Sequence, residues 1–258
     1  MLKISPLFSG SRGNCTLIQS NKVNILLDLG YNYRSIVAEL IRRSLAPSDV
    51  DAIIITHEHS DHVKALNSWA AHTSTPIYAP HLIADYVAQT QGCVVNKITC
   101  DFVIGDVTVE AYECSHDARS CYGYRFCCGN HYFASVTDTG CVTEQLVDFL
   151  SLCSAVMLES NHDVDMLLEG AYPYPLKKRI LSNVGHLSNA QAGEVLSKLI
   201  GKNPSIVILA HLSENNNTRE LAFNSAVNTY ASNGLTEGKD VTVYVADQYH
   251  NDITICLQ

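Results

Sequence analysis

A short apolar segment that runs straight into a histidine-rich loop constrains this chain more than any other feature. Residues 52–55 read Ala-Ile-Ile-Ile, a β-branched run too short for a helix and typical of a strand buried on both faces. The next residues, 56–62, read Thr-His-Glu-His-Ser-Asp-His. Sheets covered by helices expose their binding sites at the carboxyl ends of their strands. The segment therefore predicts a layered sheet-and-helix fold with a site at this strand end.

The loop offers four ligands to metal ions. His57 and His59 are two residues apart and would point the same way in an extended segment, whereas Asp61 and His62 follow at the turn into the next helix. One loop can therefore serve two metals. The zincin pattern H-E-x-x-H is absent, because Asp61 stands three residues after Glu58. The alternative is a polar surface loop that happens to be rich in histidine.

Further ligands are expected at other strand ends, because one loop is too small for a two-metal site. His116, Asp138 and His211 each follow a run that has the pattern of a strand. An aspartate between two cations can bridge them with its two oxygens. Each residue alone has an ordinary explanation as a strand-end residue, but together with the loop they indicate a metal site. Imidazole and carboxylate ligands suit Zn²⁺, Mn²⁺ or Fe, without a choice among them.

The whole chain alternates groups of strands and helices. Strands are expected at residues 4–8, 16–19, 23–28, 52–55, 77–79, several times between 94 and 134, and at 155–159, 205–210, 241–245 and 253–257. Helices are expected at residues 33–44, 63–72, 81–91, 144–152, 189–200 and 218–232. No linker rich in Pro, Gly or Ser separates the halves. We therefore expect residues 1–258 to form a single α+β domain of two β-rich layers covered by helices.

Charge and cysteine usage exclude several classes of protein. The formal net charge of −9 makes indiscriminate coating of nucleic acid implausible, so local cations must hold any phosphate substrate. Ten cysteines form no C-x-x-C pair, and neither a signal peptide nor an apolar run of membrane-spanning length is visible. We expect a cytoplasmic protein with reduced thiols and no membrane association. No obligate protein partner is implied.

Five spaced motifs resemble the YycJ/WalJ family of the metallo-β-lactamase superfamily, which is related to RNase Z-type phosphodiesterases. The motifs are Ser-Gly-Ser-Arg-Gly-Asn-Cys at 9–15, His-Asp-Ala at 116–118, Leu-Glu-Ser-Asn-His-Asp at 158–163, Gly-His-Leu-Ser-Asn at 185–189 and Ala-His-Leu-Ser-Glu-Asn-Asn at 210–216. The resemblance covers almost the whole chain. It implies a four-layer αββα sandwich with the site at one edge between the two sheets.

The resemblance also implies a ligand set for two divalent metal ions. One ion would be held by His57, His59, His116 and a bridging Asp138, and the other by Asp61, His62, Asp138 and His211. Asp28 matches a superfamily aspartate that orients ligands from outside the metal's own shell. From its sequence alone, Asp28 would be an ordinary turn residue at a strand end.

A proton donor is expected beside the metals. Glu159 and His186 match residues that protonate the leaving oxygen in RNase Z-type enzymes, and an alkoxide leaving group does require an acid. We also expect Asp61 to be a catalytic residue and His162 to lie around the pocket. The alternative is that Glu159 and His186 only hold the last β-α unit together.

Substrate contacts are expected from two places. Lys177, Lys178 and Arg179 follow two tyrosines and precede the expected acid, so they could bind a phosphate backbone while the tyrosines stack on bases. A run of charges is more often a solvated face. Arg12 and Asn14, in the Ser-Gly loop, could contact a phosphate or simply close that turn.

Taken together, the resemblance implies a binuclear metal-dependent phosphodiesterase that uses metal-bridging hydroxide, and specifically a 5′ to 3′ exonuclease acting on DNA ends. The residues themselves support only metal-assisted hydrolysis. One alternative is hydrolysis of a small phosphodiester such as a cyclic phosphate or nucleotide, because no inserted substrate-binding domain is visible. Another is a non-hydrolytic regulatory or redox protein that retains the metal ligands.

Overall fold

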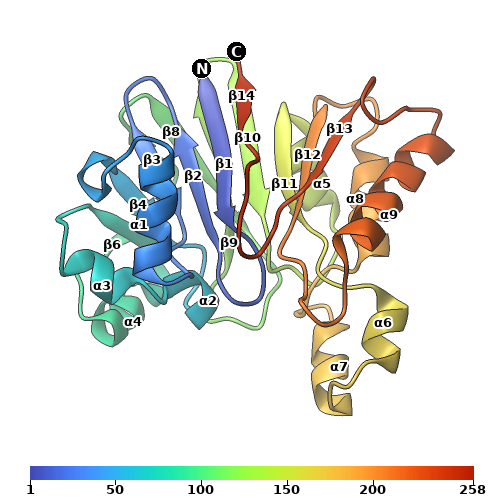
Figure 1. Ribbon diagram of the computed structural model, residues 1–258, viewed down its shortest axis with the longest axis horizontal. Helices are drawn as coiled ribbons and strands as arrows, with labels where there is room; N and C mark the ends of the chain where they lie inside the picture. Colours follow the sequence, from blue (N-terminus) through green and yellow to red (C-terminus); the bar gives the residue numbers. More distant parts are fainter.

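Two seven-stranded sheets pack face to face and carry helices on their outer faces (Figure 1). The computed structural model describes residues 1–258. Helices α1, α3 and α4 cover one sheet, and α5, α8 and α9 cover the other. This is the four-layer αββα sandwich that the resemblance implied.

The two sheets share a plan in which antiparallel strands give way to parallel ones. In order, the first sheet contains β14 (Ile255–Leu257), β1 (Leu2–Phe8), β2 (Cys15–Gln19), β3 (Asn24–Leu27), β4 (Ala52–Ile54), β5 (Ile77–Pro80) and β6 (Asn96–Ile98). The second contains β13 (Thr242–Val245), β12 (Ile206–Ala210), β11 (Ala155–Glu159), β10 (His131–Val136), β9 (Tyr122–Cys128), β8 (Val107–Glu113) and β7 (Phe102–Ile104). Strands β3 to β6 and β10 to β13 are parallel.

The helices fill the connections between the parallel strands. They are α1 (Tyr33–Arg42), the 3₁₀ turn η1 (Pro47–Asp49), α2 (Ser60–Val63), α3 (Leu66–Ala70), α4 (His81–Gln91), α5 (Glu144–Ser151), α6 (Val164–Glu169), α7 (Tyr174–Ile180), α8 (Asn189–Lys198) and α9 (Arg219–Ser232). None of them is both long and apolar enough to cross a lipid bilayer. All ten cysteines are free.

The apolar core has three layers, and the middle one joins the sheets. Ile54 of the first sheet and Phe126 and Phe133 of the second belong to one buried cluster between the sheets. Ile53, next in the chain to Ile54, instead packs in the cluster under the helices that contains Trp69. Strand β4 is therefore buried on both faces, as its sequence predicts. Because the sheets share a core, we propose that residues 1–258 fold as one domain.

The helix expected over residues 63–72 is wrong in extent. Two short helices, α2 and α3, replace it, and α2 already begins at Ser60. The Ala65 N–H donates to the Leu29 carbonyl (2.8 Å), and the Asp61 carbonyl accepts from the Asn14 N–H (2.8 Å). The helical ladder is interrupted because loops of the first sheet take these groups. Because α2 begins at Ser60, Asp61 lies in its first turn.

Helices α6 and α7 were not expected from the sequence. Both are short, and prolines at 173 and 175 give the start of α7 the composition of a loop. The Asp163 carboxylate caps α6 by accepting from the Met166 N–H (3.0 Å). Figure 1 shows the pair projecting below the second sheet, at the edge to which its parallel strands point.

A buried hydroxyl links the two sheets near their functional edge. Tyr124 of β9 is fully buried, and its hydroxyl donates to the Ile55 carbonyl at 3.0 Å, directly after β4. We expect Tyr124→Phe to lower the free energy of unfolding by about 1 to 2 kcal/mol, because the carbonyl loses a buried donor. Urea denaturation measures this change. Tyr244→Phe, which removes an exposed hydroxyl, is the matched control and should change stability by less than about 0.5 kcal/mol.

Candidate metal centre

Three site residues lie within two residues of a strand end and share an unusual backbone conformation. Asp28 after β3, Asp138 after β10 and His211 after β12 have φ angles of 62°, 58° and 56°. Residues with side chains seldom adopt this left-handed conformation, which costs free energy and gathers at functional sites. Only Ser44 shares it among the other non-glycine residues. The turn at each strand end is thus held against its intrinsic preference by the surrounding contacts.

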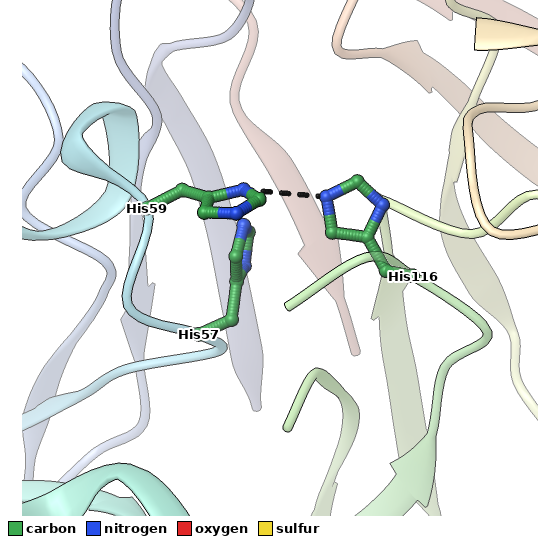
Figure 2. A group of neighbouring side chains, drawn as sticks. All are labelled: His57, His59 and His116. Carbon is green, nitrogen blue, oxygen red and sulfur yellow. Dashed lines mark hydrogen bonds between the residues drawn. The ribbon is translucent and has the colours of Figure 1, made fainter. Parts of the chain in front are cut away.

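His57, His59 and His116 form the first ligand group. Figure 2 shows their rings facing one another, with His57 and His59 from one segment and His116 from another. His59 Nδ1 lies 3.3 Å from His116 Nε2, and one ring nitrogen of each residue lies within 4.8 Å of the others. His116 Nδ1–H donates to the Gly185 carbonyl at 3.0 Å, which leaves Nε2 directed at the group. Asp138 Oδ1 lies 3.8 Å from this Nε2.

Asp61, His62 and His211 form the second group. Asp61 Oδ2 lies 3.4 Å from His62 Nε2 and 3.5 Å from His211 Nε2. Asp138 Oδ2 lies 3.4 Å from the same nitrogen of His62. Asp138 therefore stands between the two groups: its Oδ2 lies beside His62, and its Oδ1 lies between His116 of the first group and His211 Nδ1 (3.5 Å) of the second. This arrangement brings together all seven residues that the sequence singled out as ligands.

The chemistry of these atoms fits two metal ions. His57 Nε2 and Asp138 Oδ2 are buried atoms without a hydrogen-bond partner, which is costly unless another group binds them. Ligands at about 2.1 Å in a tetrahedral site lie about 3.4 Å from one another, close to the separations seen here. The site has imidazole and carboxylate donors and no thiolate. The clusters are therefore of the kind that a dinuclear metal site requires.

Electrostatics at the site favour a cation. Burial lowers the pKa of His211, but Asp138, Asp61 and Glu159 outweigh burial and raise it to about 10. Burial and the neighbouring imidazoles hold the pKa of His57 well below its ordinary value, so His57 is a neutral ligand. A divalent ion would supply the positive charge that the carboxylates attract.

Asp28 supports the second group from behind. Its carboxylate accepts from His62 Nδ1–H (2.8 Å), from the Thr56 N–H (2.9 Å) and from the Thr56 hydroxyl (3.0 Å). These bonds fix which His62 nitrogen faces the metal site. Sequence reasoning missed Thr56, whose position between the buried strand and the first histidine was the available signal.

Glu159 joins the expected acid to a ligand. It is fully buried, and its Oε1 accepts from both His186 Nδ1–H and His211 Nδ1–H at 2.8 Å. Its Oε2 accepts from the N–H groups of Thr139 (3.1 Å) and Leu187 (3.0 Å). Burial raises the pKa of Glu159, but His186 and His211 lower it well below its ordinary value. With both oxygens occupied, the carboxylate is suited to positioning side chains.

An open cleft of about 220 Å³ leads to the site. It is lined by Ser11, His59, Asp61, His116, Asp138, Asn161, Tyr172, Leu176, Arg179, Ile180, His186, His211 and Ser213. Arg179 is the only Lys or Arg among them, and its guanidinium pairs with Asp117 (Nη2 to Oδ1, 2.9 Å). Sequence reasoning missed the wall formed by α7, because it did not find that helix.

The other expected substrate contacts lie elsewhere. Lys178 is exposed outside the cleft, and Lys177 Nζ donates to the Leu168 carbonyl at 2.6 Å. The Arg12 guanidinium pairs with Glu214 (2.8 Å) on the surface. Asn14 does not line the cleft but is buried behind the ligands: its Nδ2 lies 3.1 Å from His62 Nε2, and its Oδ1 accepts from the Gly10 N–H (3.0 Å), which favours its alternative role in closing the loop.

His162 is buried but does not line the cleft. Neither ring nitrogen has a hydrogen-bond partner, and burial lowers its pKa to about 4. Its expected place around the pocket stays a prediction.

Asp28→Asn tests the support behind the ligands. Asparagine tolerates the left-handed backbone, so the turn should survive while the charged acceptor for His62 is lost. We expect the affinity for one of two metal ions to fall by about 10- to 100-fold. Titration of metal-free protein with Zn²⁺ against a chromophoric chelator measures the change, and an unchanged affinity would contradict this role.

Comparison with known proteins agrees with this geometry. The model of the metallo-beta-lactamase superfamily matches residues 9–98. Exodeoxyribonuclease WalJ of Streptococcus pneumoniae is 34% identical over 252 residues, covering 94% of this chain and 93% of that protein. Exodeoxyribonuclease YycJ of Bacillus anthracis is 34% identical over 254 residues, covering 95% and 96%.

Solved structures show the same fold at lower identity. The metallo-beta-lactamase fold protein YhfI from Bacillus subtilis superposes with a TM-score of 0.72 at 18% identity, covering 98% of each chain. The short form of human tRNase Z gives a TM-score of 0.66 at 14% identity, covering 99% of each chain. Because the relatives at 34% identity match over nearly their whole length, the chain belongs to the YycJ/WalJ family of the metallo-β-lactamase superfamily.

Proposed function

We propose that the protein is a two-metal phosphodiesterase that degrades DNA from an end. The observation that carries this proposal is the pair of ligand groups around Asp138 at the floor of an open cleft, beside the His186–Glu159 pair. The names of the relatives, exodeoxyribonucleases at 34% identity, support DNA as the substrate. The 5′ to 3′ direction is part of the proposal and rests on family resemblance.

The proposed ligands divide into two sets that share one aspartate. The first set is His57, His59, His116 and Asp138, and the second is Asp61, His62, His211 and Asp138. Two divalent cations, Zn²⁺, Mn²⁺ or Fe, would make hydroxide available at neutral pH and neutralise the oxygens of the phosphate under attack. The chain's part is to hold these donors rigidly, through Asp28 behind His62 and Glu159 behind His211.

His186 is the proposed acid. Its Nδ1–H donates to Glu159, and its Nε2 has no hydrogen-bond partner within the protein while the side chain lines the cleft. Burial lowers the pKa of His186, but Glu159 and Asp138 outweigh burial and raise it. The raised pKa favours the protonated imidazole, which can donate from Nε2 to the departing oxygen. Glu159 fixes the ring so that this nitrogen faces the substrate.

Substrate binding is proposed for the wall formed by α7. Arg179, the cation of the cleft, would exchange its partner Asp117 for a backbone phosphate. Tyr172 lines the same wall and can stack on a base. Lys178 and the Arg12 guanidinium are exposed and would contact phosphates farther from the cleft.

Degradation of DNA tests the function directly. We expect metal-loaded protein to release nucleotides from 5′-phosphorylated linear DNA and to leave covalently closed circles intact. Asp138→Asn keeps the left-handed turn but weakens the shared ligand, and should reduce activity to that of metal-free protein. Hydrolysis of bis(4-nitrophenyl) phosphate without any attack on DNA would instead support a small-molecule phosphodiesterase. Nicking of circles would exclude an exonuclease.

His186→Ala separates an acid from a ligand. Loss of a general acid should slow DNA hydrolysis by about 10²- to 10⁴-fold while two metal ions remain bound. Turnover of bis(4-nitrophenyl) phosphate should fall much less, because 4-nitrophenolate leaves without being protonated. Steady-state kinetics and elemental analysis measure the two effects. Loss of a metal ion would show that His186 is a ligand, as its position near Asp138 and His211 allows.

A further inference from the structure

The three histidines of the first ligand group come from two loops that belong to different sheets. His57 and His59 follow β4 of the first sheet, whereas His116 lies between β8 and β9 of the second (Figure 2). A metal bound by all three requires a fixed spacing between the loops. A contact between the two loops that fixes this spacing therefore contributes to metal binding, although it does not touch the metal.

The His116 loop, residues 115–120, is tied mainly to its own side of the molecule. The Ser115 hydroxyl donates to the Asn183 carbonyl (2.8 Å), and the Asp117 N–H donates to the Val184 carbonyl (3.0 Å). The His116 ring contacts the rings of both His57 and His59. Just past the loop, the Tyr122 N–H donates to the Thr56 carbonyl (3.1 Å) and fixes the start of β9. Within residues 115–120, and apart from these ring contacts, one hydrogen bond reaches the histidine loop of the first sheet: Glu58 Oε1 accepts from the Arg119 N–H at 2.8 Å.

The Arg119 side chain makes a second contact on the same side. Its guanidinium lies over the ring of Tyr86, 4.4 Å from the centroid, and Tyr86 belongs to α4. Arg119 is therefore held by its backbone on Glu58 and by its side chain on a helix that covers the first sheet. Cation–π contacts at exposed positions are weak, so the hydrogen bond is the more directional of the two.

We propose that Glu58 is a positioning residue for the first metal, and that it sets the distance of His116 from His57 and His59 by holding the Arg119 N–H. This role rests on the proposed two-metal centre. It requires an acceptor oxygen and not a charge. Glu58 Oε2 is buried without a hydrogen-bond partner, so glutamine can replace glutamate without breaking an existing bond.

Metal titration of the full-length protein tests the proposal. Metal-free protein is titrated with Zn²⁺ against a chromophoric chelator, and wild type is expected to bind two ions. Glu58→Ala should weaken one of the two by about 10- to 100-fold and leave the other unchanged. Glu58→Gln should restore most of the affinity. Glu113→Ala, which removes an exposed carboxylate near the same loop, is the charge-matched control and should have no effect.

Background variants assign the weakened ion. In His211→Ala, which retains the first group, the Glu58→Ala effect should persist, whereas in His116→Ala it should disappear. Equal weakening of both ions, or equal weakening by the Ala and Gln variants, would overturn the positioning role. Wild type that binds no metal would instead refute the metal centre, so the two failures are distinguishable. Circular dichroism of each metal-free variant checks that the fold is retained.

Discussion

The burial of carboxylates at the edge where the two sheets meet is the constraint on which the rest of the structure depends. Asp28, Asp138 and Glu159 are at most 3% exposed, and a buried charge costs several kcal/mol unless it is paired and hydrogen-bonded. Asp28 and Glu159 are matched by donors from strand ends and loops, such as the Thr56 N–H for Asp28 and two imidazoles for Glu159, whereas Asp138 has only imidazole nitrogens at 3.4 to 3.8 Å. Asp138 retains an orphaned oxygen, and it is the residue that lies between the two ligand groups.

This constraint explains why the fold tolerates strain where it does. Asp28, Asp138 and His211 adopt left-handed backbone conformations at the ends of buried strands, and the backbone N–H groups of His211 and Asp28 are held by hydrogen bonds to neighbouring segments. The His211 N–H donates to the Ser9 hydroxyl (2.9 Å), and the Asp28 N–H donates to the Ile54 carbonyl (2.8 Å). Strain at these turns aims side chains along the edge of the sandwich instead of along the strands. The strand ends thus place Asp138 and His211, whereas the other ligands come from the loop and short helix after β4 and from the loop between β8 and β9.

Sequence patterns predicted the parts of this site whose information is local. The strand before His57 was recognisable because residues buried on both faces are continuously apolar, and ligands at strand ends follow from the parallel order. Which side chain of the charged run 177–179 faces the cleft depends instead on how α7 is rotated about its axis. The sequence did not predict this helix, because two prolines give its start the composition of a loop. Of that run, Arg179 alone reaches the cleft. Likewise, the contact of Glu58 with Arg119 spans 61 residues, and no periodicity encodes it.

The same geometry reconciles an acidic protein with the proposed polyanionic substrate. Two divalent ions would balance the charges of Asp28, Asp61, Asp138 and Glu159, so the floor of the cleft need not repel a phosphate, although the chain carries a formal charge of −9. The rest of the chain still carries a negative net formal charge and should disfavour DNA bound without a phosphate at the metals. Affinity would then come from the few contacts at the scissile phosphate and from Arg179. Such a distribution of charge favours engagement at one point on a nucleic acid over coating of its length, which is compatible with the proposed action at an end.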